Sequence, residues 1–229
     1  MDQGGAGITS LPGSLALFSL NLLLLREAVS KLCLEASDSR SIHLRKVIRV
    51  KDGDFVDLAV RNGPKGKGKV FLREDGAIEL ELTWLPAHSN DLYPISLVVA
   101  QCRPQTCRKI LDQATSLGVG SFSFFQAEKS EPSYAKSSLW QSDEWIRKIE
   151  GGVAQAFSSF VPRCDRFSDL KNALDNQSLE TECQRIALDN YEASDPLSLE
   201  EVRSGRTFSL CLGPERGWSD GERKLLRSY

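Results

Sequence analysis

The sequence predicts an α/β protein in two parts, a small β-barrel followed by a parallel α/β sheet. Closely spaced short strands with turn signals between them fill residues 20–88, as in a small barrel. A strand, a helix and a second strand then follow one another from Ile95 onward, which is typical of a parallel sheet. A last strand, a glycine-containing loop and a helix start lie within Thr207–Glu222.

Composition places the chain among soluble globular proteins. Of its 229 residues, 41% are hydrophobic and 26% charged, and a net charge of −2 argues against a wholly basic nucleic-acid binder. The six cysteines are scattered without a Cys-x-x-Cys pair, and neither histidine lies near a cysteine pair, so we expect no metal site. Reduced thiols of this kind indicate a cytoplasmic protein.

The N-terminus carries an apolar run, Leu15–Leu25, that is similar in composition to a signal-peptide core. No lysine or arginine precedes the run and no Ala-x-Ala site follows it. Eleven residues are also too few to span a bilayer, so no membrane association is expected. We interpret Asn21–Leu25 as a first strand and residues 1–19 as a loose extension.

The first part, residues 20–88, is predicted from alternating apolar residues and turn signals. Its expected elements are a short helix leading into a strand (Ser41–Val50), a turn (Lys51–Asp54), a strand (Phe55–Val60), a glycine-rich hairpin loop (Asn62–Gly68), a strand (Lys69–Leu72), a turn (Glu74–Gly76) and a strand (Ala77–Leu82).

Positive charge gathers in this first part. Residues 40–73 hold ten basic and three acidic residues, a local net charge of +7 in a chain of net charge −2. Scattered lysines usually form a solvated face, but this imbalance, with three lysines in one loop, favours contacts with the phosphates of a nucleic acid.

The second part begins after a proline-flanked linker at Pro86–Pro94. Its expected elements are a buried strand (Ile95–Ala100), a helix (Thr106–Leu117) with Gly118 beyond its end, a strand (Val119–Phe125), a helix (Trp145–Ala156), a strand ending in an acidic loop (Arg185–Ala193), a short helical turn (Asp195–Val202), a strand (Thr207–Leu212) and a helix through Arg223–Arg227.

The loop between the last strand and the last helix is the candidate site. Gly213 and Pro214 end the strand, Gly217 gives a second flexible point, and Ser219 and Glu222 have the spacing of a capping box. Such a loop exposes backbone groups to a ligand at the carboxyl end of a strand, although an ordinary strand-to-helix turn has the same pattern. It is neither a phosphate-binding P-loop nor a Gly-x-Gly-x-x-Gly motif.

The residues of this loop, Gly-Pro-Glu-Arg-Gly-Trp-Ser, resemble the Gly-Pro-Glu-Gly-Gly-Phe-Ser loop of the bacterial ribosomal RNA small subunit methyltransferase E family. These are SPOUT-class enzymes, in which a trefoil knot in an α/β fold holds S-adenosylmethionine. Further segments similar to family motifs occur in the same order: His43–Asp54, Arg108–Val119, Glu128–Ser130, Glu150–Gln155 and Val161–Pro162.

The resemblance implies a PUA-like RNA-binding barrel over residues 20–88 and a SPOUT methyltransferase domain over residues 92–229. Gln113 and Ser116 replace a lysine and a glutamate of the family, and Phe157–Ser159 stands where an arginine follows the glutamine. Relatives continue beyond Tyr229 into a segment that completes the knot, so we expect a truncated domain and an incomplete knot. A homodimer through the knotted domain is expected only if that segment is present.

The function implied by the resemblance is methylation of uridine N3 in 16S ribosomal RNA, as part of ribosome biogenesis. The implied cofactor-binding residues are Leu188, Leu212, Gly213, Pro214, Glu215 and Gly217, and the RNA-binding residues are Arg40, His43, Arg45, Arg49, Lys65, Lys67 and Lys69. Glu215 and Arg216 are the catalytic candidates, with Glu215 equally interpretable as a carboxylate that braces the loop. The alternatives are a non-catalytic RNA-binding protein and a generic nucleotide-binding α/β enzyme.

Overall fold

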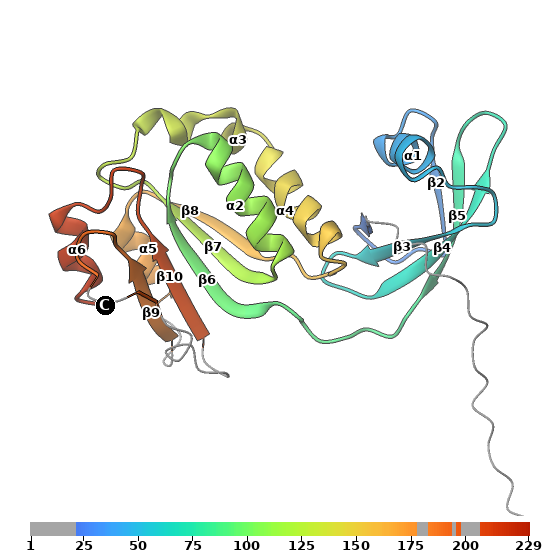
Figure 1. The fold of residues 1–229 in the computed structure, drawn as a ribbon. Helices are drawn as coiled ribbons and strands as arrows, with labels where there is room; N and C mark the ends of the chain where they lie inside the picture. Colours follow the sequence, from blue (N-terminus) through green and yellow to red (C-terminus); the bar gives the residue numbers. More distant parts are fainter. Residues whose placement is uncertain (1–21, 178–182, 194–195, 198–206) are drawn as a thin grey trace, which may run out of the picture.

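The computed structural model describes residues 22–177, 183–193, 196–197 and 207–229, which form two five-stranded sheets (Figure 1). The N-terminal sheet contains β1 (Leu23–Leu25), β2 (Lys31–Leu34), β3 (Phe55–Val60), β4 (Lys65–Leu72) and β5 (Ile78–Trp84) in the order β1-β3-β4-β5-β2. β1 pairs with β3 in parallel, and the remaining pairs are antiparallel. The predicted strand Phe55–Val60 is confirmed, whereas a closed barrel is not confirmed, because β1 and β2 remain edges of an open half-barrel.

The segment predicted as a helix leading into a strand, Ser41–Val50, is helical as far as Ile48. Asp38 caps α1 (Ser39–His43) by accepting a hydrogen bond of 2.8 Å from the Arg40 backbone N–H. The helix continues as the π-helix η1 (Leu44–Ile48) and ends at Arg49, whose φ of 60° is left-handed. The strand predicted in the second part of Ser41–Val50 was wrong, because the helix continues to Ile48 and the chain then turns at the left-handed Arg49.

The prediction of a lysine-bearing hairpin loop was also wrong, because β4 already begins at Lys65. Lys65 and the other two lysines point outward at alternate positions, while Gly66 and Gly68 between them are buried. A Cβ on Gly66 would lie 2.5 Å from the Thr83 carbonyl oxygen, so only glycine permits β4 and β5 to approach this closely.

The C-terminal sheet is entirely parallel, as predicted. It contains β6 (Tyr93–Ala100), β7 (Val119–Phe125), β8 (Arg163–Phe167), β9 (Cys183–Leu188) and β10 (Thr207–Leu212) in the order β8-β7-β6-β10-β9. The helical segments are α2 (Pro104–Ser116), the 3-10 turn η2 (Pro132–Lys136), α3 (Ser138–Gln141), α4 (Glu144–Gln155), α5 (Leu170–Gln177) and α6 (Asp220–Leu226). The predicted strands Val119–Phe125 and Thr207–Leu212 coincide with β7 and β10.

Helices cover both faces of this sheet, so the second half of its central strand β6, residues 97–100, is fully buried (Figure 1). Leu97 and Val99 of β6 join the core beneath α2 and α4, while Val98 and Ala100 join the core beneath α5. The apolar run of β6, which predicted a strand covered on both faces, therefore arises because successive residues face these two cores in turn.

The two sheets meet through β1 and through the hairpin between β3 and β4. Leu23 and Leu25 lie in the core of the N-terminal sheet, whereas Leu24 packs against the core of the C-terminal sheet. The hairpin residue Asn62 donates its backbone N–H to the Ser159 carbonyl oxygen at 2.7 Å and accepts the Val161 backbone N–H on Oδ1 at 2.9 Å.

Three predictions concern features that the described residues address only in part. Residues 1–19 and most of Asp195–Val202 lie outside the described residues. Where the structure describes helices, each is too short or too polar to cross a bilayer. Within the same part of the chain, no group of three or more His, Cys, Asp or Glu residues is placed to hold a metal ion.

Candidate functional site

The strand order of the C-terminal sheet reverses between β6 and β10. From β6 the chain proceeds to β7 on one side, while β10 lies on the other side, so the carboxyl ends of these two strands form a topological switch point. Open α/β sheets bind ligands outside their strands at such a point. Two loops meet here, residues 101–103 after β6 and residues 213–219 after β10.

Glu215 joins these two loops. Its Oε1 accepts a hydrogen bond of 3.0 Å from the backbone N–H of Arg103, the residue that precedes α2. The carboxylate therefore spans the switch point and holds the loop after β10 against the start of α2. In the loop after β6, Gln101 is buried, and its Oε1 has no partner among the residues that the structure describes. A buried oxygen of this kind is a place where a water or a polar ligand group would be stabilised.

Trp218 forms the interior of the loop after β10. Its side chain is 1% exposed and stacks on Phe125, with ring centroids 6.1 Å apart and an interplanar angle of 4°. The indole Nε1 donates to the Leu188 carbonyl oxygen at 2.9 Å, which ties this loop to the end of β9. A Cβ on Gly213 would lie 3.0 Å from the indole, so glycine permits the backbone to pass over the ring.

The loop has backbone donors available at its surface. Gly217 has a φ of 71°, and its N–H closes a turn to the Pro214 carbonyl oxygen at 2.8 Å. Within the described ranges, the N–H groups of Gly213, Glu215 and Arg216 donate to no acceptor. Unpaired N–H groups at the end of a parallel strand are the groups that ligands use in such loops.

An ion pair fixes the acidic loop after β9 to α6. Arg223 donates from Nε to Oδ2 of Asp189 at 2.7 Å and from Nη2 to Oδ1 at 3.3 Å, and both side chains are 12% exposed. These hydrogen bonds hold the pKa of Asp189 below its usual value. The Arg223 guanidinium also lies 5.6 Å from the centre of the Tyr191 ring. The same ring packs against Gly217 in the loop after β10. Three segments of the site are thus joined at Arg223.

The capping box predicted at the start of α6 is confirmed and has a second role. Ser219 and Glu222 exchange the two expected hydrogen bonds, at 2.9 and 3.0 Å. Glu222 also accepts the backbone N–H of Glu128 at 3.0 Å, and Lys129 donates to the Trp218 carbonyl oxygen at 2.8 Å. The segment after β7 is therefore attached to the same loop.

The predicted RNA-binding residues fall into two groups. Lys65, Lys67 and Lys69 form a row on the outward face of β4. Asp91 lies 3.5 Å from the Lys65 ammonium group and Asp57 lies 2.6 Å from that of Lys67.

The second group lies on and beside α1. Arg40 binds Asp38, whose hydrogen bonds raise the pKa of the guanidinium. Arg45 donates to the Gly76 carbonyl oxygen, Arg49 is exposed at the end of η1, and His43 is half-buried in α1. Arg40 and Arg45 therefore have structural partners of their own, as Lys65 and Lys67 do, while Lys67, Lys69, Arg45 and Arg49 are exposed.

An RNA methyltransferase domain matches residues 88–229, more than half of the chain. The chain belongs to the RNA methyltransferase family. This RNA methyltransferase is 23% identical over 210 residues to ribosomal RNA small subunit methyltransferase E 1 of Borreliella burgdorferi, covering 92% of this chain and 87% of that protein. It is 26% identical to ribosomal RNA small subunit methyltransferase E of Treponema pallidum, covering 82% and 72%. The resemblance noted from the loop residues is thereby confirmed.

The fold of the RNA methyltransferase is similar to a solved structure of the same family. The crystal structure of a ribosomal RNA small subunit methyltransferase E from Neisseria gonorrhoeae, bound to S-adenosyl methionine, aligns with a TM-score of 0.69. The two chains are 19% identical, and the alignment covers 91% of this chain and 85% of that one.

Several residues of the site were not predicted from the sequence. Lys129 and Tyr191 contact the loop after β10 from distant parts of the chain. Glu128 binds Glu222 at the start of α6, and Arg223 of α6 binds Asp189 in the loop after β9. Acidic residues after β9 together with arginines on the last helix gave the only sequence signal for such a contact. Of the predicted residues, Leu188 contributes its carbonyl oxygen to Trp218 and exposes 41% of its surface.

The thiols of the RNA methyltransferase differ in their environments. Burial raises the pKa of the Cys211 thiol to about 11, whereas Cys33 is exposed on β2. We expect iodoacetamide at about pH 8 to alkylate Cys33 quickly and Cys211 only after unfolding, because the thiolate is the reactive form. Peptide mass spectrometry of the native and urea-unfolded chain measures both. Rapid labelling of native Cys211 would contradict the buried environment.

Proposed function

We propose that this chain transfers a methyl group from S-adenosylmethionine to N3 of a uridine in small-subunit ribosomal RNA. The observation that carries the proposal is the loop at residues 213–219, which Glu215 and Trp218 fix at the switch point of the C-terminal sheet. The names of the relatives support the class of substrate, and the bound ligand of the Neisseria gonorrhoeae structure supports the cofactor.

The residues present fit S-adenosylmethionine. The unpaired N–H groups of Gly213, Glu215 and Arg216 and the unsatisfied Oε1 of Gln101 offer hydrogen bonds to a polar ligand at the switch point. We assign the binding of the cofactor to these groups together with Leu188, Leu212, Pro214 and Gly217. When bound, S-adenosylmethionine supplies a methyl group bonded to a positively charged sulfur, and that sulfur is the leaving group when the uridine nitrogen attacks in line.

Glu215 and Arg216 have different roles in this proposal. Because Glu215 already accepts the Arg103 N–H, we assign it to positioning, as the brace of the loop. Arg216 is exposed at the same loop and pairs with no carboxylate among the described residues. Uridine N3 must lose its proton to attack, and a nearby guanidinium stabilises the anion that forms. We therefore assign Arg216 to the target nucleotide or its phosphate.

The remaining parts of the proposal concern the arrangement of the whole enzyme. We assign residues 20–88 to RNA binding and residues 92–229 to methyl transfer, in the cytoplasm. The PUA-like character of the first part follows from the family resemblance. The resemblance implies a complete trefoil knot, and a homodimer through it, only where the segment that completes the knot is present. Sedimentation equilibrium of the chain tests the dimer.

Calorimetric titration of S-adenosylmethionine into the chain tests the proposal. We expect binding in the micromolar range, about −8 kcal/mol, and methyl transfer to small-subunit RNA that lacks the modification. Binding of RNA without any binding of S-adenosylmethionine would contradict the enzyme and favour a non-catalytic RNA-binding protein. Binding of ATP in place of S-adenosylmethionine would favour a nucleotide-dependent enzyme.

Replacing Glu215 separates bracing from catalysis. In Glu215→Ala the Arg103 N–H loses its acceptor, and the affinity for S-adenosylmethionine is expected to fall about three- to tenfold, the effect of about 1 kcal/mol at an exposed site. Glu215→Gln keeps an acceptor oxygen and is expected to bind almost as well as the wild type. A variant Glu215→Ala with unchanged affinity but much slower transfer would contradict the positioning role.

A further inference from the structure

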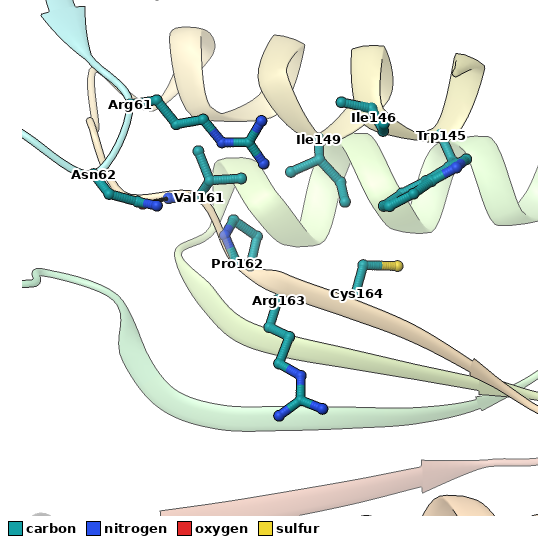
Figure 2. Close-up of a pocket in the computed structure, with 9 residues that line it drawn as sticks. All are labelled: Arg61, Asn62, Trp145, Ile146, Ile149, Val161, Pro162, Arg163 and Cys164. Atoms are coloured by element: carbon teal, nitrogen blue, oxygen red, sulfur yellow. Dashed lines mark hydrogen bonds between the residues drawn. The ribbon is translucent and has the colours of Figure 1, made fainter. Parts of the chain in front are cut away.

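A hollow lies where the two sheets meet, away from the switch point. It runs from the amino end of the edge strand β8 beneath α4, and the hairpin between β3 and β4 closes one end (Figure 2). Its volume is about 360 Å³. Small-molecule sites in proteins begin at about 300 Å³, so this space suits one small planar group and not a large ligand.

The walls of the hollow combine apolar and polar side chains and include one flat aromatic ring. Trp145 and Ile149 hang from α4 toward Val161 and Cys164 on the strand segment below (Figure 2). Ile149 is buried, whereas Trp145 is only partly buried. Aromatic rings that remain partly exposed are surfaces on which unpaired bases stack, with little dependence on the base sequence.

Polar groups stand at the hairpin end of the hollow. Asn62 is held in a left-handed conformation, with a φ of 55°, by its hydrogen bonds to Ser159 and Val161. Those bonds use its backbone N–H and Oδ1, so its Nδ2 donors have no partner among the described residues. An amide with fixed orientation and two unpaired donors can recognise the acceptor oxygens of a base.

The charge around the hollow is suited to phosphate. Two arginines line the hollow, and none of the described residues that line it carries a carboxylate. Arg61 lies at the hairpin end, 3.4 Å from Glu150, and both side chains are close to half exposed. Arg163 extends from the other face of β8 and pairs closely with Asp165, at 2.5 Å (Figure 2). Arg61 has the longer contact with its carboxylate and is adjacent to Asn62 in the chain, so we take it as the cation for this site.

One hairpin connects the hollow with the lysine row along the chain. Arg61 and Asn62 belong to the hairpin that leads directly into β4, where Lys65 and Lys67 point outward. A polynucleotide that follows the lysines along β4 therefore reaches the mouth of the hollow at the end of the strand. A nucleic acid fits this arrangement better than other polyanions do, because it also carries flat bases.

We infer that this hollow binds one unstacked nucleotide of a single-stranded RNA. The base lies against Trp145 with its edge at the Asn62 amide, and the adjoining phosphate lies at Arg61. The inference rests on the proposed RNA substrate, and it adds a contact for a nucleotide other than the one that is methylated, because the hollow lies apart from the loops after β9 and β10.

The test is binding of a fluorescently labelled oligouridylate of about ten nucleotides to the full chain in about 0.1 M salt. Trp145→Leu keeps an apolar side chain but removes the ring, and we expect its affinity to fall about 5- to 100-fold. Trp145→Phe keeps a ring and should retain most of the affinity. Tyr93→Leu is the matched control, since it removes an exposed aromatic ring outside the hollow.

Asn62→Asp provides a variant that does not depend on the packing of α4. Aspartate tolerates the left-handed backbone and keeps the acceptor for the Val161 N–H, but it replaces the free amide donors with a negative charge. We expect at least a tenfold loss of oligouridylate affinity with an unchanged thermal midpoint.

The outcomes separate this inference from the proposed function. Wild-type affinity in both Trp145→Leu and Asn62→Asp would overturn the inference. A wild-type chain that binds S-adenosylmethionine but no oligouridylate would also overturn it, while leaving methyl transfer intact. Loss of affinity in both variants, with Tyr93→Leu unaffected, is the expected result.

Discussion

Replacing Trp218 with alanine is expected to lower the free energy of unfolding by about 3–5 kcal/mol, the usual cost of emptying a buried aromatic site. The side chain is 1% exposed, stacks on Phe125 and fills the loop beneath Gly213. Its removal also leaves the Leu188 carbonyl oxygen without its donor. Because these contacts shape the proposed cofactor site, binding of S-adenosylmethionine should be lost as well. Urea denaturation and calorimetry measure the two effects.

Trp218→Phe is the matched control for this prediction. Phenylalanine stands at this position in the family loop and keeps a ring over Phe125, but it has no Nε1 donor for Leu188. We expect a loss of about 1 kcal/mol, the contribution of one hydrogen bond, with cofactor binding retained. An alanine variant as stable as the phenylalanine variant would show that the ring does not support the loop.

Two adjacent glycines in α4 are expected to respond to alanine with opposite signs. A Cβ on Gly152 would lie 2.6 Å from the Asp112 carbonyl oxygen and 2.7 Å from Thr115 Cβ, both on α2. Alanine there must push the two helices apart, and we expect a loss of about 1–3 kcal/mol in the free energy of unfolding.

Gly151 is exposed, and a Cβ there would approach only Asp112 Oδ1, at 3.8 Å. Gly151→Ala removes a flexible residue from a helix interior without a clash, so a gain of about 0.5–1 kcal/mol is expected. Thermal or urea unfolding of the two variants side by side gives the comparison. Equal effects of the two changes would contradict the close crossing of α2 and α4 at Gly152.

The elements predicted well are those whose local pattern and burial agree. β10 begins and ends where its apolar residues do, and the capping box of α6 forms because Ser219 and Glu222 need only their own backbone partners. Gly118 has the left-handed φ of 82° expected beyond the end of α2. Local chemistry sufficed in these places.

The errors arose where the fold overrides local preference. Glycines and lysines alternate in β4, and their composition is that of a loop, yet the buried positions need residues without side chains because β5 passes so close. The pairing of Arg223 with Asp189 and the contact of Glu215 with Arg103 join residues that are 34 and 112 positions apart. Sequence patterns report neither the separation nor the geometry of such pairs.

The three-residue strand β1 serves two cores at once, with Leu24 facing one and its neighbours the other. The backbone of Leu22 adds a hydrogen bond of 3.5 Å to Ala154 at the end of α4. If the C-terminal half unfolds, Leu24 loses its apolar surroundings, and if the N-terminal half unfolds, Leu23 and Leu25 lose theirs. We therefore expect heat to unfold both halves in a single cooperative transition. A fragment that begins at the linker would lack Leu24 and would expose the apolar surface that Leu24 covers.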